Sequence, residues 1–295
     1  MNKVRRRAIL IPLLIVVLLG LWMSWAAGSI MMRGHASAVA PARPPARDLT
    51  IRTSDGLTLA ATYRPGSRAG APAVLLLHGV DASRGALAAN AEWLSKQGYA
   101  TLTIDFRGHG GSSMAQRSFG LNEGEDARAA FDWLKRAQRS APVAIIGISL
   151  GGAASLIGER GPVPADALIL QAVYPDIRHA IHNRIASRLT ALPAYLLEPL
   201  LSYQSRLRFG VWPDRMSPRD AVARYSGPVM VIGGIEDRST PPEETRSIYA
   251  AATGKRALWL VPHGDHPVVC GLETGEYRRR VLAFLRAAIG EPTGG

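Results

Sequence analysis

Six short apolar runs recur at intervals along the chain and constrain its fold more than any other feature. They occupy residues 73–77, 100–104, 143–146, 167–170, 229–232 and 257–261. A strand that is buried on both faces is apolar at almost every position, and such strands are typical of parallel sheets. The sequence therefore predicts an α/β fold with a mostly parallel sheet.

Segments with helical periodicity separate these runs, at residues 86–97, 122–136, 242–251 and 277–288. Strand and helix alternate, which predicts right-handed connections and helices on both faces of the sheet. Ahead of the first run, residues 49–53 and 57–63 flank an Asp55-Gly56 turn signal. This local pattern predicts an antiparallel hairpin at the start of the domain.

An amphipathic insertion interrupts the alternation at about residues 176–225. Apolar residues follow one another at a spacing of four, and a leucine-rich stretch broken by two prolines comes next: Ile177, Ile181, Ile185 and Leu189, then residues 192–201 with Pro193 and Pro199. We expect a short helical lid.

The first 28 residues read as a transmembrane anchor. Residues 8–28 carry no charge, and roughly 21 helical residues at a rise of about 1.5 Å cover a hydrocarbon core of about 30 Å. A basic cluster, Lys3 to Arg7, precedes the segment, and Trp22 and Trp25 lie toward its far end. Basic flanks stay cytoplasmic and tryptophan favours the interface, so the catalytic domain is expected outside the cytoplasm.

A cleaved signal peptide is the alternative to an anchor, and it would make the protein secreted. Ala36-Ser37-Ala38 offers the small residues that a signal peptidase requires, although the apolar segment is longer than usual. Residues 29–47 are rich in Pro, Ala and Arg and predict an extended spacer. The folded domain is expected at residues 48–290.

Charge and cysteine content exclude some classes of protein. The formal net charge is +12, but the basic residues form no stripe interleaved with aromatics, so nucleic-acid binding is not predicted. Cys270 is the single cysteine, so no disulfide can form within the chain.

The segment Gly147-Ile148-Ser149-Leu150-Gly151 follows one apolar run and precedes a helical segment. A G-x-S-x-G sequence between strand and helix is the pattern of a nucleophile elbow, which raises the serine hydroxyl above the sheet. The turn is so tight that Gly147 and Gly151 are expected for steric reasons. Ser149 is therefore the predicted nucleophile.

Another strand ends in His78-Gly79-Val80, at the place where an oxyanion donor would be needed. We expect the backbone N–H groups of Val80 and Leu150 to form the oxyanion hole. His78 is interpreted as a structural residue at the strand end.

A serine nucleophile needs a histidine base and a carboxylate that orients it, in the chain order Ser, acid, His. Asp237 follows the strand at 229–232, and His266 follows the strand at 257–261. These two residues complete the predicted triad. Asp176 is the alternative acid and His263 the alternative base, while a metal site or a cofactor is not expected.

The chain resembles the α/β-hydrolase superfamily, because the motifs of that family occur in the same order along the sequence. They are the His78-Gly79 step, Asp105-Phe106-Arg107-Gly108-His109-Gly110, the elbow at 147–151, the segment of Asp237 and the loop of His266. The similarity extends over residues 48–290 and is greatest to the serine aminopeptidase and monoacylglycerol-lipase-like branch. The resemblance implies that Arg107 and His109 brace the entrance of the active site.

The expected activity is that of a serine hydrolase that cleaves a small-molecule carboxylic ester or thioester through an acyl-enzyme. An aminopeptidase-like enzyme and a non-catalytic membrane-anchored member of the fold are the alternatives. Oligomeric state does not follow from the sequence.

Overall fold

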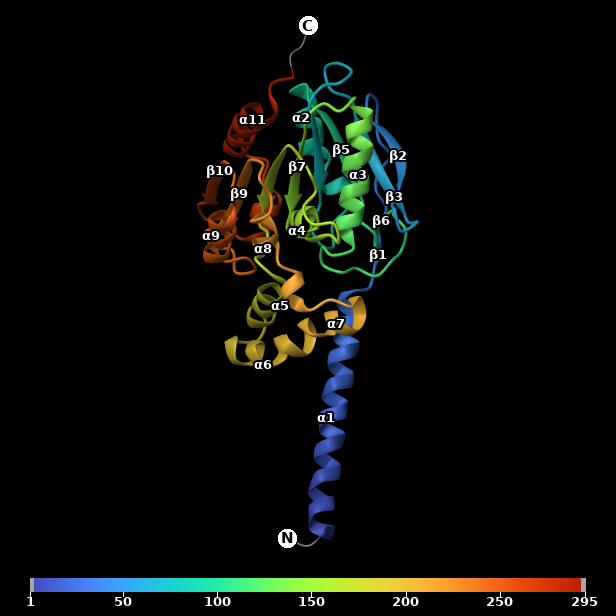
Figure 1. The fold of residues 1–295 in the computed structure, drawn as a ribbon, viewed down its shortest axis with the longest axis vertical. Helices are drawn as coiled ribbons and strands as arrows, with labels where there is room; N and C mark the ends of the chain where they lie inside the picture. The colour runs from blue at the N-terminus through green and yellow to red at the C-terminus, as the bar shows by residue number, and fades with distance from the viewer. Residues whose placement is uncertain (1–2, 293–295) are drawn as a thin grey trace.

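A computed structural model describes residues 3–292, with side chains from Leu10 onward (Figure 1). Its main sheet has eight strands in the order β10-β9-β8-β7-β4-β5-β3-β2. Six of them, from β10 to β5, are parallel, while β3 and β2 form an antiparallel hairpin at one edge. The predicted α/β architecture is confirmed. The strands are β2 (Arg47–Arg52), β3 (Thr58–Arg64), β4 (Ala73–Leu77), β5 (Ala100–Ile104), β7 (Val143–Ile148), β8 (Ala167–Gln171), β9 (Val229–Gly234) and β10 (Arg256–Val261).

Helices cover both faces of this sheet and create two hydrophobic cores. In β4, Leu75 and Leu77 belong to one core while Val74 and Leu76 belong to the other, because successive side chains of a strand point to opposite faces. The first core includes residues of α3 (Glu123–Ala137), α4 (Leu150–Ile157), α8 (Pro218–Val222) and α9 (Pro242–Ala251). The second includes residues of α2 (Ala88–Lys96), α10 (His266–Cys270) and α11 (Gly275–Ile289).

The predicted lid consists of α5 (Ile177–Ala186), α6 (Ala191–Ser202) and α7 (Gln204–Phe209). These helices lie below the sheet in Figure 1, beside the end of α1 (Lys3–Met31) that meets the domain. Residues of α5 and of α8 (Ala221 and Val222) are buried in the first core, so both ends of the inserted segment pack on the main domain.

Helix α1 is long and apolar enough to cross a membrane over Leu10–Met31, where the mean hydropathy reaches 2.3. Its far half is fixed to the lid. Ser24 Oγ donates to the carbonyl of Leu200 at 2.8 Å, and the guanidinium of Arg208 lies 3.7 Å from the centre of the Trp25 ring. The basic cluster at residues 3–7, on which the predicted orientation rests, lies outside the described side chains.

The segment after α1 does not hold the domain at a distance, contrary to the expected spacer. Helix α1 continues to Met31, and β1 (His35–Ala36) then pairs in parallel with β6 (His109–Gly110). Further along, the side chain of Ala46 is buried. The N–H groups of His35 and Ser37 donate to the backbone carbonyls of Gly108 and Gly110, in the loop after β5. Because these backbone groups bond to each other, the segment runs along the domain.

Arg107 joins three separate parts of the domain, which agrees with the structural role that the resemblance implies. Its guanidinium donates to Asp126 of α3 at 2.7 Å and to Asp55 in the hairpin turn, also at 2.7 Å. Arg107 and Asp126 are both buried. The remaining short elements are two 3₁₀ turns, Arg84–Leu87 and Pro213–Arg215.

We predict that Asp126→Asn destabilises the protein by about 3–5 kcal/mol, because it removes one partner of a buried ion pair and leaves the other charge poorly compensated. Asp132→Asn, the same change at a half-buried position of α3, should alter the free energy of unfolding by less than about 0.5 kcal/mol. Urea unfolding of both variants measures the difference. Equal stabilities would show that the ion pair does not hold the domain together.

Candidate active site

Ser149 lies at the tight turn between β7 and α4, in a strained backbone conformation with φ 49° and ψ −109°. The turn requires glycine on both sides. A Cβ on Gly151 would lie 2.3 Å from the carbonyl oxygen of Leu77, and one on Gly147 would lie 2.6 Å from the backbone of Gly152. Such strain persists only where neighbouring structure enforces it, and it is typical of a nucleophile elbow.

The loop after β4 lies beside this serine. A Cβ on Gly79 would be 3.6 Å from Cβ of Ser149, and Val80 and Leu150 line the same cavity as Ser149. The neighbouring His78 is buried, with Nε2 accepting from the N–H of Phe106 at 3.1 Å and Nδ1 lying 2.7 Å from the Gly79 carbonyl. Burial lowers the pKa of His78 to about 4. This neutral, fully bonded ring holds the loop in place.

Asp237 and His266 meet beyond the ends of β9 and β10. Nδ1 of His266 is 2.8 Å from Oδ2 of Asp237, whose other oxygen accepts from the N–H groups of Ser239 and Thr240, both at 2.8 Å. The carboxylate is buried and held at both oxygens. It therefore fixes the orientation of the imidazole.

The hydrogen bond to Asp237 also affects the protonation of His266. Burial of the ring lowers its pKa, but the hydrogen bond to Asp237 and the sulfur of Cys270 raise it, and the net result is a pKa of about 9. An imidazole with a raised pKa is a stronger base once its proton has been lost.

The alternative acid and base are engaged elsewhere. Asp176 caps α5 by accepting from the N–H of His179, and its other oxygen lies 2.7 Å from Nδ1 of His179. His263 pairs with Glu236 at 3.0 Å, and its side chain is 91% exposed. Neither residue is oriented by contacts with Ser149, Asp237 or His266.

The predicted residues thus form two groups. Ser149 lies with Val80 and Leu150 around one cavity, and Asp237 is paired with His266. Gln171 at the end of β8 connects the two groups. The N–H of Ser149 donates to the backbone carbonyl of Gln171 at 2.8 Å. The side-chain amide of Gln171 donates to the carbonyl of Val269, in the helix that begins at His266. Ser149 and His266 are therefore linked through one buried residue that the sequence analysis missed.

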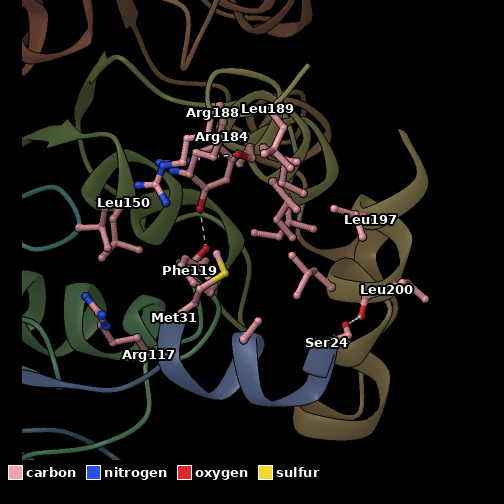
Figure 2. A pocket seen from close by; sticks show the side chains of 18 of the residues that line it. Ser24, Met31, Arg117, Phe119, Leu150, Arg184, Arg188, Leu189, Leu197 and Leu200 are labelled. Carbon is pink, nitrogen blue, oxygen red and sulfur yellow. Dashed lines mark hydrogen bonds between the residues drawn. The ribbon is translucent and has the colours of Figure 1, made fainter. Parts of the chain in front are cut away.

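Ser149 opens into a cavity of about 770 Å³ between the domain, the lid and α1 (Figure 2). Most of its lining side chains are apolar. The contribution of α1 was not predicted. Its signal in the sequence is slight, a row of mainly small residues at helical spacing within an otherwise bulky apolar segment: Gly20, Met23, Ser24, Ala27 and Met31.

Comparisons with known proteins agree with this geometry. Residues 70–209 match the family described as serine aminopeptidase, S33. The chain is 31% identical over 255 residues to an uncharacterized protein of Mycobacterium tuberculosis, covering 84% of this chain and 82% of that protein. It is also similar to the lysophosphatidylserine lipase ABHD12 of Macaca fascicularis, with 29% identity over 63% of this chain and 46% of that enzyme.

Among solved structures, the fold is similar to the Pyrococcus furiosus esterase Pf2001. The TM-score is 0.67 at 22% sequence identity, with 86% of this chain and 98% of that chain covered. An esterase from Thermogutta terrifontis superimposes with a TM-score of 0.59 at 17% identity, over 82% and 99% of the two chains. Taken with the sheet order and the matched relatives, these findings show that the chain belongs to the α/β-hydrolase superfamily.

Proposed function

We propose that this protein is a serine hydrolase that cleaves carboxylic ester bonds, with Ser149 as nucleophile, His266 as base and Asp237 as the orienting acid. One observation carries the proposal. A buried carboxylate holds His266 by a 2.8 Å hydrogen bond at the same sheet edge as the strained backbone of Ser149. This arrangement is what an activated serine requires.

In the proposed reaction, neutral His266 removes the proton of Ser149 as Oγ attacks the ester carbonyl. The N–H groups of Val80 and Leu150 stabilise the oxyanion, at about 3–4 kcal/mol for each donor. His266 then gives its proton to the leaving alcohol, and the acyl–oxygen bond breaks. Water, deprotonated by the same imidazole, releases the carboxylic acid from the acyl-enzyme. A thioester would react in the same way.

The cavity favours an ester over the free amino terminus of a peptide. An aminopeptidase needs an unpaired acidic group to bind the substrate's ammonium. The carboxylate of Asp81, which lines the cavity, forms an ion pair with Arg117. Glu198 of α6 is paired with Arg178 at 3.2 Å. Both negative charges are already neutralised.

The length and composition of α1 support a second part of the proposal, that this helix anchors the enzyme in a membrane. Its apolar span of 22 residues, Leu10–Met31, is about 33 Å long at a rise of 1.5 Å per residue. The basic residues before it favour a cytoplasmic N-terminus, which would put the catalytic domain on the other side of the membrane. Mass spectrometry of the mature N-terminus would identify a cleaved signal peptide instead.

Replacing the nucleophile is the direct test of the proposed activity. We expect Ser149→Ala to lower kcat/KM for p-nitrophenyl esters by at least about 10³-fold and to abolish labelling by a fluorophosphonate. The matched control is Ser155→Ala in α4, the helix that follows Ser149, where the hydroxyl donates to the Gly152 carbonyl. It should retain both activities.

Each other outcome has a defined meaning. Undiminished labelling of Ser149→Ala would refute the assignment of the nucleophile. Faster cleavage of aminoacyl-naphthylamides than of esters by the unaltered protein would identify a peptidase. An unaltered protein that neither reacts with the probe nor cleaves any ester or amide would be a non-catalytic member of the fold.

The pKa of His266 predicts how activity depends on pH. Because the base acts in its neutral form, kcat/KM should rise with pH and level off only near the raised pKa of about 9. Asp237→Asn removes the carboxylate whose hydrogen bond is the largest contribution to the raised pKa, so the inflection should move to lower pH while the rate falls by about 10⁴-fold.

NMR titration of the imidazole in Ser149→Ala protein measures this pKa without relying on activity. Glu236→Gln is the control, since this adjacent acid pairs with His263, and it should leave the titration of His266 unchanged. A midpoint of His266 that Asp237→Asn did not lower would contradict the proposed pairing.

A further inference from the structure

The membrane-spanning helix forms one wall of the active-site cavity. The five residues of α1 that line it follow the spacing of a single helical face. Opposite them stand apolar side chains of α5 and α6, including Ile181, Leu197 and Leu200. Figure 2 shows Leu197 and Leu200 of the lid beside α1, with Ser24 hydrogen-bonded to the carbonyl of Leu200. The cavity is therefore completed only by the anchor.

The part of α1 that lines the cavity lies within its apolar span. Gly20 to Met31 falls inside Leu10–Met31 and extends for about 16 Å at a rise of 1.5 Å per residue. That is about half of a hydrocarbon core of about 30 Å. With α1 in a bilayer, the residues of α1 that line the cavity lie at the level of the outer half of the hydrocarbon core.

The lid, like α1, exposes large apolar side chains. Four side chains on α6 and α7 that point away from the domain core are exposed by 67–77%, namely Leu192, Tyr195, Leu196 and Leu207. Ser24, the contact of α1 with α6, is seven residues before the end of the span, or about 10 Å deep. Amphipathic helices at membrane surfaces bury their apolar face to about 5–10 Å. The lid thus has the depth and the composition of an interfacial element.

We propose that the substrate is a long-chain acyl ester resident in the membrane, and that its chain enters the cavity between α1 and α6, along Met23 and Ala27. The ester carbonyl then reaches Ser149 at the other end of the cavity. The inference rests on the proposed function and adds the substrate class and the direction of entry. Each methylene that leaves water for an apolar wall improves binding about fourfold, so the cavity selects for chain length.

The test uses the full chain in vesicles of dialkyl-ether phosphatidylcholine, which contain no carboxylic ester bond. Hydrolysis of p-nitrophenyl palmitate dissolved in the bilayer is compared with that of water-soluble p-nitrophenyl butyrate. Met23→Trp narrows the α1 wall, and Leu21→Trp is the matched control, since the two side chains are 58% and 52% exposed but only Met23 lines the cavity.

We expect Met23→Trp to lower kcat/KM for palmitate at least tenfold and that for butyrate less than twofold, as expected if two or more methylenes lose their site. Leu21→Trp should change neither value. If Met23→Trp abolished fluorophosphonate labelling, Gly20→Leu would take its place, because no atom lies within 4 Å of a Cβ at that position of the same wall.

The results separate the two proposals. Unchanged selectivity for palmitate over butyrate in both wall variants, with butyrate still cleaved in a Ser149-dependent manner, would overturn the inference alone. Equal loss by Leu21→Trp would also overturn it. Failure of the unaltered protein to cleave either ester would instead overturn the proposed function.

Discussion

The central strands are covered by helices on both faces, and this burial determines where everything else can lie. Because β10 to β5 are parallel, their carboxyl ends fall at a single edge of the sheet. Ser149 follows β7, Asp237 follows β9 and His266 follows β10. Ser149 and His266, more than a hundred positions apart in the sequence, are thereby brought to the same edge of the sheet. This is the usual place for sites in α/β proteins.

The elbow at Ser149 shows how such a framework supports local strain. A positive φ at a residue with a side chain costs of order 1–3 kcal/mol. Here the residue is flanked by β7 and α4, and its N–H donates to β8. The neighbouring glycines allow the backbone of β4 to approach within contact distance of the turn. Packing of the sheet thus enforces a conformation that the peptide alone would avoid.

The lid and α1 add a second architecture to this framework. The lid helices leave the sheet edge and bond to α1 through Ser24, Trp25 and Ser29, with Gln204 and Arg208 as donors from α7. These polar contacts set the distance between the two elements, and the apolar cavity lies between them. In a membrane-anchored enzyme, such a position couples the site to the lipid phase, which a free spacer would not do.

Much of this protein could be predicted from its sequence, because periodicity and turn chemistry are local. The main-sheet strands, the helices α2, α3, α9 and α11, the hairpin at Asp55-Gly56 and the elbow glycines follow from patterns a few residues long. The sequence already favoured Asp237 over Asp176 and His266 over His263, but the contacts of these four side chains needed the tertiary structure. All four residues follow strands, and only packing shows that Asp176 caps a helix while His263 faces solvent. The link through Gln171 and the cavity face of α1 also needed the tertiary structure. An apolar run shows that a helix is surrounded by an apolar environment, but it does not show which partner lies beside each face.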